Sequence, residues 1–455
     1  MHQMKIQELI SPLDNRYNLK VEDLANNFSE SNLNKIRFEI EIDWIMFLSS
    51  QCGKNFKPLS SSAKNNLLKI RNSFDAKSSK RIKVIESRTN HDVKAVEYFI
   101  REKIKKFPNL KKYEYLVHFA LTSEDVNSLS YAILLKEAKE IYLKKLDFLI
   151  KDLNSKSKSW SSLPLLARTH GQAASPTTLG KELKVFHQRL LRQKHILKKM
   201  KPLAKFGGAT GNFHTLELSD AKVNWLSKTN KFLSSFGVEQ NPITTQIEPH
   251  DGIAEIAHCI QRINNIIIDL DQDAWIYISN DIFKLKLKDG EVGSSTMPHK
   301  VNPIDFENSE GNLGISNSLM GFFAEKLPKS RLQRDLSDST VLRNLGIGFA
   351  YSYLGITSCL DGLKKIQPNK EAAILELSNN WQVLSEAIQI VMKLEGYSDA
   401  YEEIKTLTRG KNINKDSYHE LVENLQISSD SKDKLRKLTP LTYLGIASEL
   451  AKSNI

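Results

Sequence analysis

The segment Gly290–Pro303 carries the densest set of side chains that could do chemistry. It reads G-E-V-G-S-S-T-M-P-H-K-V-N-P and holds two serines, a lysine and an asparagine among two glycines and two prolines. Glycines let backbone N–H groups approach an anion closely, and a proline at a helix start exposes further donors. One of the serines could bind a carboxylate or a phosphate, or its oxygen could take a proton if Lys300 stabilised the alkoxide. A flexible turn rich in small residues explains the same pattern equally well.

A second segment, Arg168–Ala173, contains a histidine beside a glycine. It follows Pro164 and precedes Gly180, so we expect a connection between helices rather than the middle of one. Histidine readily gives or takes a proton near neutral pH, which makes His170 a candidate acid or base. A lone histidine is more often structural, and the residues by themselves leave both interpretations open.

Three further segments place polar side chains at expected helix starts. Thr89 or Asn90 could cap a helix that has Asp92 in its first turn. Thr122–Asp125 also resembles a helix start, and Thr244–His250 precedes what we expect to be the longest helix. A purely structural role explains each of them.

Arginines gather in the segment Arg331–Arg343, which also contains Arg334 and Ser339. A guanidinium can bind a carboxylate or a phosphate through two parallel hydrogen bonds. Ordinary surface ion pairs explain isolated arginines equally well.

Long helices must position these segments. Apolar side chains recur every three or four residues, which puts them on one helical face, at Leu135, Ala138, Tyr142, Leu146, Leu149 and Leu153. The stretch Gly252–Gly290 has no internal glycine or proline and carries a similar stripe. We expect further helices at Lys181–Lys201, Ile304–Lys326 and Leu342–Lys365. Such long stripes need equally long neighbours, which predicts a bundle that other subunits help to complete.

The ends of the chain predict smaller helical regions. At 455 residues the chain can bury more than one core. We expect an N-terminal helical domain at 1–111, a central long-helix domain at 112–365 and a C-terminal helical domain at 366–455. In the last of these, helices are expected at Glu371–Leu377 and Pro440–Lys452.

The charge balance is basic, with 65 lysines and arginines against 53 acids and a formal charge of +12. This balance could mark a binder of nucleic acid or of another anion. Because the lysines are scattered along the chain without a nucleic-acid motif, solvated helix faces are the favoured explanation. We therefore expect no nucleic-acid partner.

Cysteine usage and hydropathy predict a cytoplasmic protein. The three cysteines lie far apart without metal-ligand spacing, which argues against a disulfide framework and a zinc site. Met1–Ile10 lacks the apolar core of a signal peptide, and no run of about 18 apolar residues occurs. We expect neither export nor a membrane span.

Taken together, these segments resemble the fumarase/aspartase superfamily. Gly293–Pro303 matches every fixed position of its signature, G-S-S-x-M-P-x-K-x-N-P. Histidine before lysine, at His299-Lys300, is similar to the adenylosuccinate lyase branch and to a cycloisomerase relative. The longer bacterial members of that branch are also similar from about residue 10 to the end of the chain, notably at Ser11–Tyr17, Thr89–Lys94, Thr122–Asp125, Arg168–Gln172 and Thr244–His250.

The resemblance implies a fold and a reaction. The fold would be all-α with three domains and a long central helical bundle, in a homotetramer whose active sites are shared between subunits. The reaction would be β-elimination of fumarate from two small-molecule substrates of purine biosynthesis, adenylosuccinate (giving AMP) and SAICAR (giving AICAR). It would need no metal and no organic cofactor. Another superfamily lyase, the cycloisomerase and a non-catalytic homologue remain alternatives.

The resemblance also implies residue roles. Ser294 would be the general base, preferred over Ser295 as the first serine of the signature, and His170 the general acid. Lys300 and Asn302 would bind the succinyl carboxylates, and Gly290 and Gly293 would let the loop close over the substrate. Nucleotide or phosphate contacts would come from Arg16, Tyr17, Arg334, Ser339 and Arg343. The pocket would be completed by Asn90, His91, Asp92, Thr122, Ser123 and Gln246, with His91 a secondary acid–base candidate.

Overall fold

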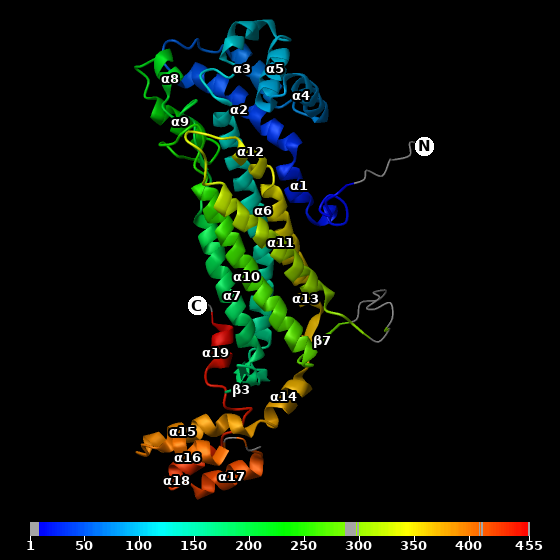
Figure 1. Cartoon of the computed structure of the whole chain (residues 1–455), viewed down its shortest axis with the longest axis vertical. Helices are drawn as coiled ribbons and strands as arrows, with labels where there is room; N and C mark the ends of the chain where they lie inside the picture. Colours follow the sequence, from blue (N-terminus) through cyan, green and yellow to red (C-terminus); the bar gives the residue numbers. More distant parts are fainter. Residues whose placement is uncertain (1–8, 287–296, 298–299, 409, 411–412, 454–455) are drawn as a thin grey trace. The chain divides into compact units, whose positions relative to one another are not determined.

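The computed structural model describes residues 9–286, 297, 300–408, 410 and 413–453, and these residues form two compact units. Unit 1 comprises Met1–Leu146, Gln193–Asn265 and Gly311–Thr357, and unit 2 comprises Asp147–Arg192, Ile266–Glu310 and Ser358–Ile455. Five of the described helices, all labelled in Figure 1, have residues in both units. They are α6 (Ser123–Ser159), α7 (Leu179–Lys199), α10 (Asp251–Ser279), α11 (Ile304–Lys326) and α13 (Leu345–Lys365). None of the described helices combines the length and the apolar character that crossing a bilayer requires.

The expectation of an all-α fold is confirmed. The described strands are only two or three residues long and pair two by two. The pairs are β1 (Pro164–Leu165) with β4 (Thr177–Thr178), β2 (Arg168–Thr169) with β3 (Gln172–Ala173), β5 (Leu203–Ala204) with β6 (Glu239–Gln240), and β7 (Phe283–Leu285) with β8 (Ile366–Pro368). These pairs fasten loops to helix ends and build no sheet layer.

Unit 1 is centred on α2 (Glu30–Gln51), which buries apolar side chains along most of its length. Trp44 packs edge-on against Phe206 and Phe232, at 5.0 Å between ring centroids in each case. The shorter elements of this unit are η1 (Asn18–Lys20), α1 (Glu22–Phe28), α3 (Ser61–Arg71), α4 (Ala76–Thr89), α5 (Asp92–Ile104), η2 (Pro108–Leu116), α8 (His214–Ser219), α9 (Trp225–Ser234) and α12 (Ser337–Leu342).

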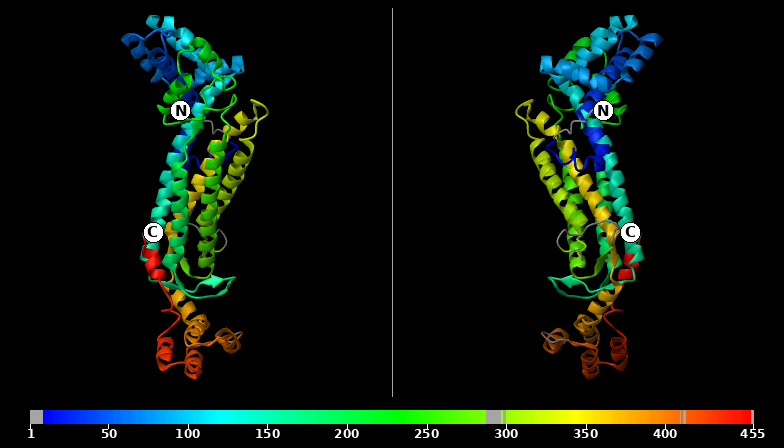
Figure 2. Two further views of the ribbon diagram at one scale, coloured as in Figure 1. Left: turned by 90° about the vertical axis from the view of Figure 1, so that its left-hand side faces the viewer. Right: turned by 90° about the vertical axis from the view of Figure 1, so that its right-hand side faces the viewer.

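A buried chain of hydrogen bonds joins four long helices within unit 1. Ser352 of α13 contacts Tyr142 of α6 at 2.8 Å between hydroxyl oxygens and donates to Asn264 of α10 at 2.5 Å. The Asn264 amide donates to Ser316 of α11 at 3.1 Å. All four side chains are fully enclosed, so each hydrogen bond fixes the register of one helix against the next. The helices run alongside one another in both views of Figure 2.

Unit 2 has a core of its own in the C-terminal helices, where Trp381, Ile388 and Tyr418 are buried together. Its elements are α14 (Lys370–Ser378), η3 (Trp381–Leu384), α15 (Ser385–Leu394), α16 (Ala400–Thr408), α17 (Lys415–Asn424), α18 (Ser429–Arg436) and α19 (Ala447–Lys452). The Ser157 hydroxyl of α6 donates to the Ala451 carbonyl at 2.8 Å, which holds α19 against the long helix.

Helix identities agree with the sequence better than helix ends do. The boundaries of α11 agree with prediction, and α6 rather than α10 is the longest described helix. Helix α10 ends at Ser279, because Asp281 turns the backbone into the left-handed region with φ of 58°. The terminal helix starts at Ala447, later than expected, after Gly445 with φ of 52°. The three-domain division stays a prediction.

Candidate active site

His170 lies at the tip of a tight hairpin in unit 2. Strands β2 and β3 pair antiparallel, and only His170 and Gly171 connect them, with φ of 53° and 74°. Positive φ at both central residues gives a two-residue turn a twist that matches the right-handed twist of the two flanking strands. The His170 side chain is exposed, and Arg168 anchors the hairpin through an ion pair with Glu376 of α14. The prediction that His170 lies in a connection is confirmed.

The signature loop is only partly described. Gly290, Gly293, Ser294, Ser295 and His299 lie outside the described residues. Later in the same segment, Lys300 is exposed and donates its backbone N–H to the Met297 carbonyl at 3.1 Å. Asn302 is half-buried. Both precede the first turn of α11, at the positive end of the helix dipole.

Asp92 joins two arginines within unit 1. Its Oδ2 lies 2.9 Å from Nη2 of Arg37 on α2 and 2.9 Å from Nη2 of Arg343, which follows α12. Burial alone would raise the pKa of the Asp92 carboxyl, but the two arginines and the backbone N–H of Val93 outweigh it and lower that pKa. The carboxylate is therefore held ionised between two cations.

The helix cap at this place differs from the sequence expectation. The N-cap of α5 is His91, whose Nδ1 accepts a hydrogen bond from the Lys94 backbone at 3.2 Å. Asn90 instead ends α4, in the left-handed conformation that asparagine tolerates. Asp92 does lie in the first turn of α5, as predicted. The expectation that Thr89 or Asn90 caps α5 was wrong, because an exposed imidazole supplies the acceptor.

A cleft of about 370 Å³ in unit 1 is lined by Arg343 together with apolar side chains such as Phe28 and Ile347. Leu13 and Asp14 also line it, and Arg16 and Tyr17 follow one residue later. The Arg16 guanidinium lies over the Tyr17 ring, 5.7 Å from its centroid. The cleft has the size of a small-molecule pocket. One predicted nucleotide contact, Arg343, lines it, and two others, Arg16 and Tyr17, lie close in sequence to its lining residues.

Arg334 and Gln246 meet, although 88 positions separate them. Nη1 of Arg334 donates to Oε1 of Gln246 at 3.0 Å, and the Gln246 backbone N–H donates to the Gln333 carbonyl at 3.3 Å. Nη2 of Arg334 lies 3.3 Å from Oε2 of Glu124. Ser339, on α12, donates its backbone N–H to Oδ1 of Asp338 at 2.8 Å. These contacts bring together the start of α6 and the segments that precede α10 and α12.

Thr122 and Ser123 are held at the start of α6. The Thr122 backbone N–H donates to Oδ2 of Asp125 at 2.8 Å. Oδ1 of the same carboxylate accepts from Nζ of Lys205 at 2.6 Å and from the backbone N–H of Gly208 at 3.1 Å. Asp125 and Lys205 are both fully buried, so this ion pair fixes the backbone that presents Thr122 and Ser123.

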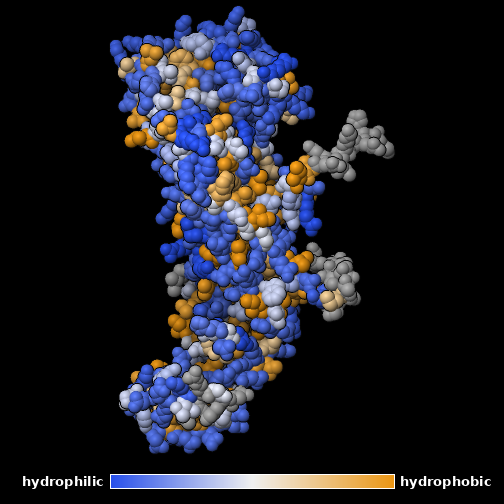
Figure 3. All heavy atoms as spheres, viewed as in Figure 1, coloured by the Kyte–Doolittle hydropathy of each residue, from blue (hydrophilic) through white to orange (hydrophobic). Residues whose placement is uncertain are grey.

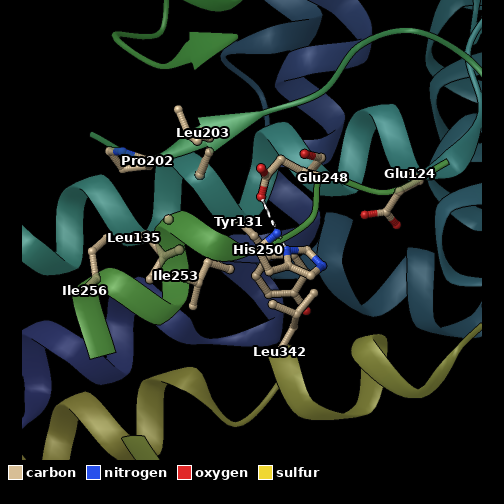
Figure 4. Close-up of a pocket in the computed structure, with 13 residues that line it drawn as sticks. Glu124, Tyr131, Leu135, Pro202, Leu203, Glu248, His250, Ile253, Ile256 and Leu342 are labelled. Atoms are coloured by element: carbon tan, nitrogen blue, oxygen red, sulfur yellow. Dashed lines mark hydrogen bonds and ion pairs between the residues drawn. The ribbon is translucent and has the colours of Figure 1, made fainter. Parts of the chain in front are cut away.

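Beside Glu124 lies a cavity of about 20 Å³, enough for one water molecule. Figure 4 shows His250 between Glu248 and Leu342, with its Nδ1 3.7 Å from a Glu248 carboxylate oxygen. Its Nε2 lies 3.6 Å from Oδ2 of Asp338. Glu124 is enclosed, and burial raises the pKa of its carboxyl to about 7, with Asp338 adding to the rise.

Several residues of these clusters were missed from the sequence. Glu124 and His250 lie in segments that we singled out, but no role was expected for either of them. Arg37 stands between Ile36 and Phe38 on a buried helix, and a charge within an apolar run was the signal that could have revealed it. Within the described residues, no group of three metal-binding side chains lies close enough to hold an ion.

The chain is similar to several known proteins along most of its length. A family model described as lyase matches residues 15–318, and one described as adenylosuccinate lyase C-terminal matches residues 330–444. The adenylosuccinate lyase of Escherichia coli is 45% identical over 440 residues, 96% of each chain. That of Haemophilus influenzae is 45% identical over 99% of each chain. A solved structure, the 3-carboxy-cis,cis-muconate lactonizing enzyme from Pseudomonas putida, is 17% identical with a TM-score of 0.73 over 94% of each chain, which shows the fold alone.

Proposed function

The chain belongs to the adenylosuccinate lyase family, and we propose that it cleaves adenylosuccinate into AMP and fumarate by β-elimination. The observation that carries this proposal is 45% identity to lyases of that name along almost the whole chain. SAICAR is proposed as a second substrate, because it also joins a succinyl group to a ribotide monophosphate. The same pocket would then serve two steps of purine biosynthesis, one leading to IMP and one to AMP.

The elimination needs a base, an acid and donors for the charge that develops on a carboxylate. Ser294 is proposed as the base that removes the proton from the carbon next to one succinyl carboxylate. His170 is proposed as the acid that protonates the departing nitrogen. Its exposed position at the tip of a constrained hairpin supports that role, because an exposed imidazole can exchange a proton with a ligand.

Lys300 and Asn302 are proposed to hold the succinyl carboxylates. Their place before the first turn of α11 supports this, because the positive end of the helix dipole adds to the lysine charge. As charge moves onto the carboxylate during proton removal, the same donors stabilise the transition state more than the ground state.

The nucleotide is proposed to bind to residues of unit 1. Arg343, which lines the cleft of about 370 Å³, and Arg334, held by Gln246, are the proposed phosphate contacts. The other proposed nucleotide contacts are Arg16, Tyr17 and Ser339. The rest of the pocket would be formed by Asn90, His91, Asp92, Thr122, Ser123 and Gln246. Asp92 positions Arg343 rather than meeting an anion itself, because its carboxylate is already shared by two arginines.

A homotetramer with shared active sites is part of the proposal. Large apolar side chains stand exposed on the long helices, namely Trp275 and Ile276 on α10 and Ile315 and Phe322 on α11. Figure 3 shows apolar side chains among polar ones along this helical surface. Exposed apolar groups of this size favour burial against other copies of the chain. A cytoplasmic location is proposed with it, since all three cysteines are buried free thiols.

The proposal is tested by adding purified protein to adenylosuccinate and identifying the products by chromatography. Formation of AMP and fumarate in equal amounts is the expected result. A folded protein that releases neither, but cleaves another succinyl or malate-like compound, would keep the superfamily and overturn the substrate. Light scattering of the same sample checks the oligomer, and a monomeric mass would contradict the shared active site.

A further inference from the structure

Glu124 is a buried residue whose carboxylate lies beside Arg334, a proposed contact of the nucleotide phosphate. It is 2% exposed, and its Oε2 lies 3.3 Å from Nη2 of Arg334, whose side chain remains partly open to solvent. The other terminal nitrogen of Arg334, Nη1, donates to Oε1 of Gln246 at 3.0 Å. One hydrogen bond to Gln246 and one ion pair with Glu124 therefore hold the guanidinium from two sides. The other oxygen of Glu124, Oε1, has no hydrogen-bond partner in the described part of the chain.

The charges around Glu124 leave it poised to take a proton. Facing it are Arg334 and Asp338 from α12 and the segment before it, His250 from the start of α10, and Lys205 from the segment after β5. Lys205 is already paired with Asp125, and His250 faces both Glu248 and Asp338. Carboxylates thus outnumber the permanent cations in this enclosed cluster, and an extra negative charge nearby would favour the protonated form of Glu124.

We propose that Glu124 is a positioning residue, which orients the guanidinium of Arg334 for the phosphate of the nucleotide and takes up a proton when that phosphate binds. The inference rests on the proposed function, because it takes Arg334 as a phosphate contact. A phosphate dianion on the open side of Arg334 would stand within a few ångströms of a carboxylate in a low-dielectric interior. That repulsion raises the proton affinity of Glu124 by about one pH unit or more.

Proton uptake and nucleotide affinity are reciprocal. If phosphate binding favours the protonated carboxyl, then protonation must strengthen phosphate binding by the same factor. Since burial raises the pKa of Glu124 to about 7, the free enzyme changes its protonation across the neutral range. The KM for adenylosuccinate is therefore expected to rise as the pH increases from 7 to 8.5, in wild type but not in Glu124→Gln.

The direct test is calorimetric titration of the wild-type protein with AMP at pH 7, in buffers that differ in ionisation enthalpy. Uptake of up to about half a proton is expected for wild type, because a group with a pKa near 7 is half ionised there. Glu124→Gln should lose this uptake. Glu97→Gln, which neutralises another buried glutamate of unit 1 without touching Arg334, should keep it. Equal proton counts in wild type and Glu124→Gln would overturn the proposal.

Positioning is tested separately by comparing Glu124→Ala with Glu124→Gln. Glutamine keeps an oxygen that Arg334 can donate to, whereas alanine leaves the guanidinium without that acceptor. At pH 7 the KM of Glu124→Ala is expected to rise roughly tenfold or more, with kcat changed much less, and glutamine should restore most of the loss. An unchanged KM in a folded Glu124→Ala protein would overturn the positioning role. If alanine prevents folding, the pH profile of Glu124→Gln decides instead.

The outcomes separate this inference from the proposed function. A wild-type protein that forms no AMP and fumarate overturns the function, and the inference falls with it. A wild-type protein that cleaves adenylosuccinate, while the pH dependence of its KM and its proton uptake both match those of Glu124→Gln, leaves the function standing and overturns the inference alone.

Discussion

The carboxylate of Asp92 accepts a hydrogen bond from Arg343 at 2.9 Å, across 251 positions of the sequence. The same oxygen lies 2.9 Å from the buried arginine Arg37. One carboxylate therefore ties the start of α5 to α2 and to the segment after α12. This contact both stabilises unit 1 and orients Arg343, a proposed contact of the nucleotide phosphate.

Asp92→Asn should destabilise the protein. The substitution removes the charge that faces Arg37, whose side chain is only 2% exposed, and leaves a buried cation without its counterion. We expect the free energy of unfolding to fall by roughly 3 kcal/mol. Urea denaturation at matched protein concentration measures this change, with Asp75→Asn, an exposed cap on α4, as the milder comparison. A loss no larger than that of Asp75→Asn would contradict the buried-pair argument.

His170→Ala should abolish most of the activity without unfolding the protein. General acid catalysis contributes roughly 100-fold to 10,000-fold, and kcat for fumarate formation should fall by that order. Gln172→Ala, in the same hairpin, changes an exposed side chain that has no proposed role and should retain most of the activity. Near-normal turnover of purified His170→Ala would remove the imidazole from the mechanism.

Gly171 should be sensitive to substitution although its surroundings are open. No atom stands within 4 Å of a Cβ added there, but its φ of 74° strains any residue with a side chain. Gly171→Ala should cost about 1 kcal/mol in the hairpin and reduce kcat by displacing His170. Gly171→Asn should be milder, because asparagine tolerates this conformation. Equal kcat values for wild type and Gly171→Ala would show that the turn does not position the acid.

Ser294 and Ser295 can be separated by two matched substitutions. Ser294→Ala should lower kcat by several orders of magnitude, whereas Ser295→Ala should lower it much less, since the base role is proposed for the first serine alone. Fumarate release under saturating adenylosuccinate measures both. The reverse order of effects would move the base to Ser295.

The long helices were predictable because their pattern is local. Apolar residues every three or four positions mark a buried face, and the bounds of α11 agree with the sequence prediction. Helix ends were harder to predict. The end of α10 depends on one left-handed residue, Asp281, and the start of α5 on an unusual histidine cap. Neither follows from periodicity.

The partners of the site residues were not predictable, because they come from distant parts of the chain. The motifs identified Arg334 and Gln246 separately, but their hydrogen bond joins residues 88 positions apart. Glu124 reads as an ordinary acidic residue in the first turn of a helix. Only the packing of α12 and the segment before α10 around it encloses the carboxylate and raises its pKa to about 7.

His118 should make the stability of unit 1 depend on pH. It lies in a left-handed turn before Thr122, with Nδ1 2.6 Å from Glu41 and Nε2 3.7 Å from Glu97. Burial alone would lower the pKa of the imidazole, but the hydrogen bond to Glu41 and the charges of both glutamates outweigh it and raise the pKa above 6.5. The protonated form is therefore the stabilising one.

The sign of that dependence follows from the direction of the shift. A group whose pKa is raised by folding stabilises fully below its unfolded value of about 6.5 and loses this contribution as the pH rises through the folded value. Wild type should therefore lose more stability than His118→Asn between pH 6 and 9 in urea titrations. Asparagine suits the variant because it tolerates the φ of 58°. Parallel stability curves for the two proteins would mean that the glutamates do not hold a charged imidazole, and that the turn before Thr122 depends on packing alone.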